Sequence, residues 1–183
     1  MDACLPSADP WRGLPRGRLP FRAVNRVGAP DYHPGLQRHH LLPRAVLAAP
    51  SFAALFAALG PGCVGFDDFR RNGLLLPGTC EAAQRLGLPL HRGPHPHYTA
   101  VVMDRLGAIE RDWAGQHRRC ARAARRDALF RLGLLQRGLR QSLLRERPRR
   151  RPLSRRDPRL RDDLFADLDA MAEAIWGACA PWS

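Results

Sequence analysis

The residues with the clearest capacity for chemistry are histidines that stand in two short groups. His39 and His40 are adjacent, and His91 and His95 follow with three residues between them. A neutral imidazole is a preferred ligand for Zn²⁺, Ni²⁺ and similar divalent ions. An imidazole with a pKa near 6.5 can also take a proton from water close to neutral pH. The two groups therefore predict a catalytic metal site with a neighbouring general base, although each histidine taken alone also fits a surface or capping role.

The adjacent pair predicts its own place in the fold. Successive side chains of a strand point to opposite faces, so two histidines meant for one pocket fit a regular strand poorly. They fit the end of a strand, where one imidazole points inward and the other points toward solvent or substrate. Pro43 follows closely and ends the segment.

The second group should stand at the start of a long helix. Pro94 and Pro96 fall where a first helical turn tolerates proline, so His91 and His95 bracket the helix start. The positive end of a helix disfavours protonated histidine and leaves the ring lone pairs free for a metal. Apolar residues then follow the 3.6-residue period and predict a buried stripe: Tyr98, Val101, Val102, Leu106, Ile109 and Trp113.

Shorter elements are predicted between the two groups. Ser51 is placed to cap a helix over 52–59 that ends at Gly60, and Thr79 is placed to cap another that ends at Gly87. Asn72-Gly73 is the strongest short turn signal, and residues 74–76 read as a strand that ends at Pro77. Strands and helices mixed in this way predict an α+β fold.

Composition divides the chain into five segments. Residues 1–30 are rich in Pro, Gly and Arg and predict a loosely ordered lead-in, and 31–115 should form the folded core. Residues 116–144 predict a basic amphipathic helix, so the extension after the core should be mostly helical and rich in Arg. The stretch 145–161 is an Arg- and Pro-rich linker, and 162–183, with four Asp and no Arg, is an acidic C-terminal helix.

The charge of the chain points to a polyanionic partner. The 183 residues include 30 basic residues, all of them Arg, against 17 acidic ones, which gives a formal net charge of +13. The guanidinium of Arg binds phosphate in a bidentate way that Lys cannot match, so nucleic acid is the leading class of partner. A run of arginines in the linker either follows a phosphate backbone or is only solvated: Arg147, Arg149, Arg150, Arg151, Arg155 and Arg156.

Other sequence features bear on the compartment. The five cysteines are scattered without a C-x-x-C pair, which disfavours a disulfide framework and a structural zinc site and favours synthesis in the cytoplasm. The N-terminus lacks the pattern of a signal peptide, and no uncharged apolar stretch approaches the roughly 20 residues that span a bilayer. No membrane association is expected, and export would require a dedicated secretion system.

Three motifs resemble those of a known nuclease family. The stretches HHLLP (39–43), NGLLLP (72–77) and HRGPHPHY (91–98) are similar to the AHH nucleases of the HNH and endonuclease VII superfamily, many of which are bacterial toxin domains. The resemblance covers roughly residues 30–105. Arg38 stands where the family has its first-letter Ala, which we interpret as a packing position.

The resemblance implies a fold and a set of roles. A ββα-metal (treble-clef-like) core would hold one divalent ion, Mg²⁺, Mn²⁺, Ni²⁺ or Zn²⁺, between His39, His91 and His95. His40 would be the general base, and Asn72 would tie the loop and orient His40. The activity implied is a metal-dependent endonuclease acting on DNA in preference to RNA, with an immunity protein as a further partner if the chain is a toxin. Asp67 and Asp68 are candidate partners for a ligating histidine, and His97 is assigned no chemical role.

Two other functions fit the same residues. A metal-free ribonuclease would use two histidines as acid and base. A non-catalytic nucleic-acid-binding protein would use its histidines to hold a structural ion.

Overall fold

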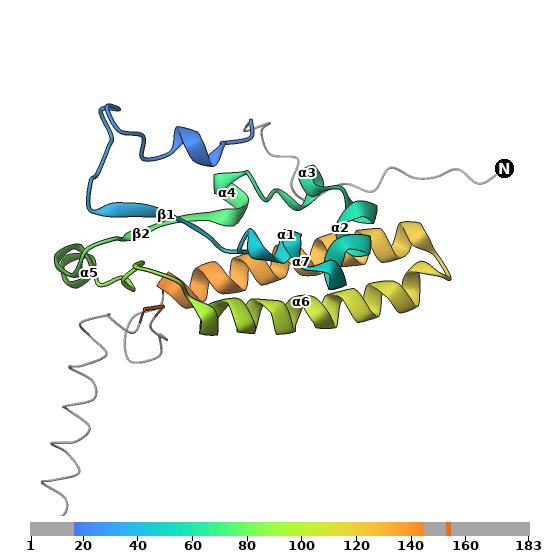
Figure 1. Ribbon diagram of the computed structural model, residues 1–183. Helices are drawn as coiled ribbons and strands as arrows, with labels where there is room; N and C mark the ends of the chain where they lie inside the picture. The colour runs from blue at the N-terminus through green and yellow to red at the C-terminus, as the bar shows by residue number, and fades with distance from the viewer. Residues whose placement is uncertain (1–16, 145–152, 155–183) are drawn as a thin grey trace, which may run out of the picture.

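The structure, a computed structural model, describes residues 17–144 and 153–154. It confirms an α+β fold in which a two-stranded sheet accompanies several helices (Figure 1). The elements run in this order along the chain: η1 Phe21–Ala23, β1 Leu36–His40, α1 Ala45–Ala48, η2 Pro50–Phe52, α2 Ala53–Leu59, α3 Pro61–Val64, α4 Phe69–Asn72, β2 Gly73–Pro77, α5 Cys80–Leu86, α6 Pro96–His117 and α7 Ala121–Leu144.

Strands β1 and β2 pair antiparallel over five residues. The register runs from Leu36 opposite Pro77 to His40 opposite Gly73, so the histidine pair stands at the last two positions of β1. The strands are joined through α1 to α4 and not through a tight turn. The pair therefore lies at a strand end, as predicted from its adjacency.

The prediction of a hairpin-type turn at Asn72-Gly73 is wrong, because a helix meets a strand there. Asn72 is the last residue of α4, and Gly73 begins β2 with an extended backbone, φ −112°. A Cβ at position 73 would lie 2.2 Å from the ring of Phe69. Glycine is therefore required here for close approach of an aromatic ring and not for a hairpin turn.

The long helices α6 and α7 lie side by side and form the base of the molecule, with the sheet and short helices above them (Figure 1). On α6, Val102, Leu106, Ile109 and Trp113 are buried as predicted, whereas Val101 is 38% exposed. Helix α7 also packs against α2, α3 and α4.

Two predicted boundaries do not coincide with breaks in packing. Helix α7 covers most of the predicted segment 116–144, yet its buried residues, Leu132 and Leu139 among them, belong to the same hydrophobic core as α6. The described part of the lead-in, 17–30, also packs on the core. Phe21 is buried, and the backbone N–H of Phe69 donates to the carbonyl of Leu19 at 2.7 Å.

The other local predictions have mixed outcomes. Thr79 caps α5 by accepting from the N–H of Ala82, and Gly60 and Gly87 follow α2 and α5 directly. Ser51 is not a cap, because a 3₁₀ turn, Pro50–Phe52, precedes α2. None of the described helices is both long and apolar enough to cross a membrane. The predicted linker, apart from residues 153–154, and the acidic helix 162–183 lie outside the described residues.

Candidate metal centre

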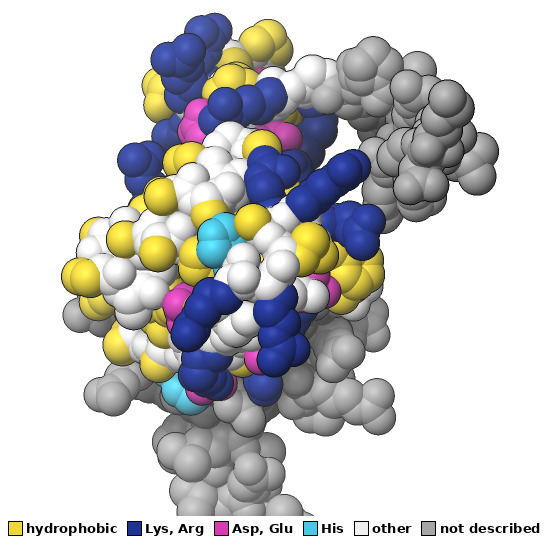
Figure 2. Space-filling view, turned by 90° about the vertical axis from the view of Figure 1, so that its right-hand side faces the viewer, with side chains coloured by type: hydrophobic (Ala, Val, Ile, Leu, Met, Phe, Trp, Pro, Cys, Tyr) yellow, Lys and Arg dark blue, Asp and Glu magenta, His cyan; other side chains and the backbone are white. Residues whose placement is uncertain are grey.

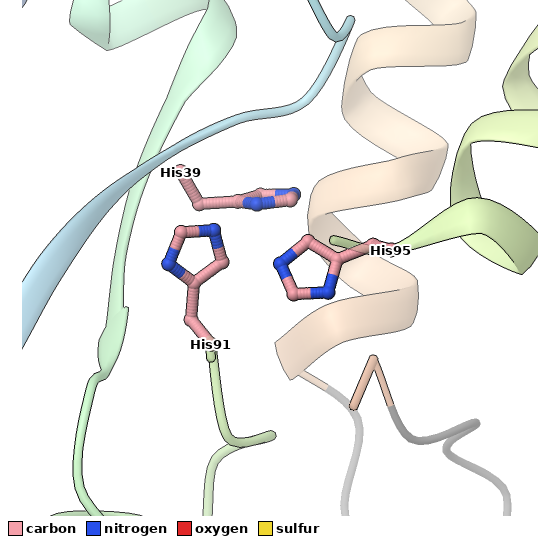
Figure 3. A group of neighbouring side chains, drawn as sticks. All are labelled: His39, His91 and His95. Carbon is pink, nitrogen blue, oxygen red and sulfur yellow. The ribbon is translucent and has the colours of Figure 1, made fainter. Parts of the chain in front are cut away.

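Three histidines from separate segments point toward one another at the start of α6 (Figure 3). His39 comes from β1, His91 from the loop after α5, and His95 is the N-cap residue of α6. Each offers a ring nitrogen, and these atoms all lie within 4.8 Å of one another. The ring centroids are 4.9 Å apart for His39 and His91, 4.7 Å for His91 and His95, and 5.9 Å for His39 and His95.

The buried member of this cluster has an unsatisfied ring nitrogen. His39 is only 4% exposed, and its Nε2 has no hydrogen-bond partner among the described residues. Leaving a buried polar atom without a partner costs free energy, so most such atoms are paired with protein, water or an ion. The donor set beside it consists of two further imidazoles, which suits a divalent cation of the borderline class.

Burial and neighbouring rings keep two members of this cluster, His39 and His91, unprotonated. Burial, together with the neighbouring rings of His91 and His95, lowers the pKa of His39 to about 3. Burial and the nearby His95 lower the pKa of His91 to about 4. Both rings therefore remain neutral at physiological pH. Their lone pairs are available, as metal ligation requires.

Two hydrogen-bond partners fix the orientation of the partly buried members, His91 and His95. Nδ1 of His91 lies 3.1 Å from Oε1 of Gln37, and Nδ1 of His95 lies 3.1 Å from the carbonyl oxygen of Leu153. In each case the ring nitrogen donates to an oxygen, which leaves Nε2 as the free acceptor. This is the arrangement that commonly orients a metal-ligating histidine.

The predicted carboxylate partners do not fill this role. Asp67 forms an exposed ion pair with Arg18 at 3.1 Å. Asp68 accepts from the backbone N–H groups of Leu19 and Arg70 and caps α4. Sequence reasoning therefore missed Gln37, whose signal was its place two residues before His39 on the same face of β1.

Backbone and aromatic contacts hold the histidines in place. The N–H of His91 donates to the carbonyl of Pro77 at 2.6 Å, which ties the loop to the end of β2. The Tyr98 hydroxyl donates to the carbonyl of Leu41 at 2.7 Å, and its ring packs against His39 with centroids 5.1 Å apart.

His40 faces the other side of β1. Its ring stacks in parallel on Phe21, with centroids 3.7 Å apart and planes 2° apart. Burial and the nearby Arg44 lower the pKa of His40, and Asp67 partly offsets this. His40 also contributes to the low pKa values of His39 and His91, so it stands within electrostatic reach of the cluster.

Asn72 is fully buried and ties the segment that follows the histidine pair. Its backbone carbonyl accepts from Leu41 N–H at 2.8 Å, and its Oδ1 accepts from Leu42 N–H at 2.8 Å. Its Nδ2 donates to the carbonyls of Leu42 and Phe66, both at 3.2 Å. Among the described residues, the bonds to Leu41 and Leu42 hold the backbone that follows His40, and none of these Asn72 bonds involves the His40 imidazole. Asn72 therefore acts on the strand end.

The arginines of the described chain are widely spread. Figure 2 shows many of them spread over one end of the molecule, with several acidic side chains among them. Charge alone therefore does not locate a substrate path on this surface. The predicted phosphate-contacting residues lie outside the described residues: Arg147, Arg149, Arg150, Arg151, Arg155 and Arg156.

Comparison with known proteins gives one significant match. Residues 21–137 match the model of the AHH family, described as a nuclease family of the HNH/ENDO VII superfamily with conserved AHH. Curated proteins and solved structures give no significant match. The matched region begins at the buried Phe21 and ends within α7, so it includes part of the N-terminal segment and most of the C-terminal helix that pack on the core.

Proposed function

The chain belongs to the AHH family of nucleases, and from this membership and the histidine cluster we propose that it is a metal-dependent endonuclease that hydrolyses phosphodiester bonds of DNA. The observation that carries the metal dependence is the buried Nε2 of His39, which has no partner among the described residues and faces two further imidazoles.

Each residue of the site has a proposed task. His39, His91 and His95 would hold one divalent ion, with Gln37 and the Leu153 carbonyl orienting two of the rings. When bound, such an ion supplies Lewis acidity to the phosphoryl oxygen and the leaving alkoxide. His40 is the proposed general base that accepts the proton of the attacking water. Its lowered pKa keeps the ring unprotonated at neutral pH.

The metal-free ribonuclease is the weaker alternative. That mechanism needs one histidine protonated near neutral pH so that it can act as general acid. Burial and neighbouring rings hold the pKa values of His39 and His91 far below that range, at about 3 and about 4. The cluster is therefore better suited to ligate a cation than to donate a proton.

A plasmid-cleavage assay tests the proposal. The full chain is incubated with supercoiled DNA and Mg²⁺, Mn²⁺, Ni²⁺ or Zn²⁺, with and without excess EDTA, and a structured RNA is tested in parallel. We expect cleavage of DNA with at least one ion, and loss of cleavage with EDTA. Cleavage that survives EDTA would refute the metal dependence, and binding without cleavage under any ion would favour a non-catalytic nucleic-acid-binding protein.

We also propose a toxin role, which rests on the family resemblance alone. Expression of the wild-type chain in a bacterial host should then arrest growth, and the His40→Ala variant should not. Equal growth of both strains, with equal protein levels, would contradict it.

A further inference from the structure

A hollow beside strand β1 has the composition of a nucleotide-binding subsite. It has a volume of about 330 Å³ and lies on the side where the loop 25–33 passes the strand. Its walls combine aliphatic, aromatic, amide and guanidinium groups: Asn25, Val27, Tyr32, Leu36, Gln37 and Arg38. We refer to it below as the Tyr32 hollow.

The loop that forms the rim of the Tyr32 hollow is held by one asparagine. Asn25 Nδ2 donates to the carbonyls of His33 and Leu36 at 3.0 and 2.8 Å, and its Oδ1 accepts from His33 N–H at 2.7 Å. Asn25 also has a positive φ of 47°, which asparagine tolerates better than most residues. Tyr32 is therefore presented on a loop that is tied to β1.

The exposed groups of the hollow match the parts of a nucleotide. Tyr32 is 37% exposed and Val27 76% exposed, so an aromatic and an aliphatic surface are both open to solvent. Aromatic side chains stack on nucleobases whatever the sequence. Arg38 is exposed, donates through Nη1 to the carbonyl of Phe21 at 2.9 Å, and forms no ion pair with the acidic residues of the described chain. A guanidinium has five N–H donors, so the remaining ones are available to a phosphate.

The hollow is linked to the proposed site through two of its lining residues, Gln37 and Arg38. Gln37 forms one wall, and its Oε1 contacts His91. Arg38 forms another wall and bonds to Phe21, whose ring stacks on His40. Arg38 and His40 are two residues apart on one face of β1, which places their Cα atoms about 7 Å apart. A phosphate held by Arg38 would therefore lie close to the proposed base.

Position 38 also distinguishes this chain from the family motif. Arg38-His39-His40 stands where the family has Ala-His-His. The interpretation of position 38 as a packing position is wrong, because Arg38 is exposed and lines the hollow.

A second hollow of about 330 Å³ is a weaker candidate. It is lined by His33, Thr79, Glu81 and Arg85 among others. Its lining therefore includes a carboxylate and includes neither Tyr nor Trp on which a base could stack. A phosphate would be repelled by the carboxylate of Glu81.

From these contacts we propose that the Tyr32 hollow binds one nucleotide next to the scissile phosphodiester, with Tyr32 stacked on its base and Arg38 on its phosphate. The proposal rests on the proposed function. Because bases inside a duplex are already stacked on one another, the hollow should take a base from single-stranded or locally melted DNA. We therefore expect single-stranded DNA to be the preferred substrate class.

Binding measurements with cleavage switched off test the proposal. The affinity of the full chain for a fluorescein-labelled single-stranded oligodeoxynucleotide is measured by anisotropy in EDTA at several salt concentrations. Tyr32→Ala should weaken binding about 5- to 150-fold through the lost stacking, whereas Tyr32→Phe should stay within about twofold. Arg38→Ala should weaken binding and reduce the slope of log affinity against log salt by about 0.7, the value for one phosphate contact on a single strand.

Matched controls separate stacking from charge. Arg119→Ala removes an exposed arginine in the turn between α6 and α7 and should leave binding within about twofold. Heparin, a polyanion without bases, should bind Tyr32→Ala as tightly as wild type but Arg38→Ala more weakly. Arg38→Lys keeps the positive charge and loses the bidentate guanidinium, so its affinity for the oligodeoxynucleotide should lie between those of wild type and Arg38→Ala. Thermal melts check that each variant is folded.

The outcomes distinguish the subsite from the enzyme. Wild-type affinity in both Tyr32→Ala and Arg38→Ala, or equal losses in Arg119→Ala, would overturn the subsite even if the chain cleaves DNA. Selective losses in Tyr32→Ala and Arg38→Ala would support the subsite even if the wild-type chain cleaved nothing, in which case the proposed function fails alone.

Discussion

The two faces of strand β1 differ in burial, charge and neighbours, although the residues that represent them, His39 and His40, are adjacent in the sequence. On one face His39 is buried among His91, His95 and Tyr98. On the other face His40 is half-buried against Phe21, near Arg38 and Arg44. The alternation of a strand therefore separates a candidate ligand from a candidate base.

This difference explains the value of two adjacent histidines. A base that shares the ligand pocket would compete for the ion, whereas a base on the next residue stays close without binding it. The two faces also draw on different parts of the chain. The His39 face depends on the start of α6, and the His40 face depends on the segment before β1.

The sharpest way to separate the two faces is to remove the base. His40→Ala should lower the rate of DNA cleavage by about 10²- to 10⁴-fold, the usual contribution of a general base. The rate is measured by plasmid nicking at saturating divalent ion. His97→Gln, an exposed histidine on α6, serves as the matched control and should cleave at close to the wild-type rate. A His40→Ala variant with wild-type activity would break the assignment of the base.

A second test concerns the residue that ties the strand end. Asn72→Ala should lower the free energy of unfolding by about 2–4 kcal/mol, because it leaves several buried backbone groups without partners. Urea denaturation measures the change. Gln136→Ala removes only weaker contacts at 3.3–3.4 Å and should cost less. Equal stability of Asn72→Ala and wild type would show that the strand end does not need this anchor.

A third test uses pH to examine the buried face. The pKa of His39 is about 3 in the folded protein and about 6.5 in the unfolded chain, so the unfolded chain binds a proton first as the pH falls. Stability from the neutral ring is present above pH 6.5 and is lost as the pH falls toward 3.

Between pH 7.5 and pH 5.0, His39 alone should lower the free energy of unfolding of the metal-free protein by about 2 kcal/mol. Urea midpoints in EDTA at the two pH values measure this. The His39→Gln variant should show a smaller decrease, and an identical decrease would contradict the burial of a neutral ring at position 39.

The smallest expected effect concerns the partner of His91. Gln37→Ala should weaken divalent-ion binding about tenfold, the lower end of the range for a residue that orients a ligand, because Gln37 is exposed. Gly78→Ala should act in the same direction, since a Cβ there would lie 2.8 Å from Gln37 Nε2. Gln84→Ala on α5 is the control. Unchanged affinity in Gln37→Ala and Gly78→Ala would remove Gln37 from the site.

The sequence predicts those parts of the fold that local patterns determine. The strand end at His40, the strand after Gly73, and the position of His95 at the start of a long helix follow from period, proline and glycine. In the apolar stripe predicted on α6, Val101 is exposed at the edge of the helix and Tyr98 is only partly buried.

The contacts that complete the site are not local. Gln37 meets His91 across 54 positions, and His95 meets the carbonyl of Leu153 across 58. The stack of His40 on Phe21 likewise depends on how the segment before β1 packs. Periodicity and capping rules describe residues that are close in the sequence, so they cannot predict these long-range partners. Asn72-Gly73 shows the converse, because close approach of the Phe69 ring decides the need for glycine there.

The most direct test is the binding of a divalent ion by matched variants of the histidine pair. Isothermal titration of Zn²⁺ or Ni²⁺ into the full metal-free chain should give one ion per wild-type chain. His40→Ala should bind with an affinity within about threefold of wild type, and His39→Ala should bind at least about 100-fold more weakly. His39→Ala with wild-type affinity, or equal losses in both variants, would contradict the assignment of the two faces of β1 to different tasks.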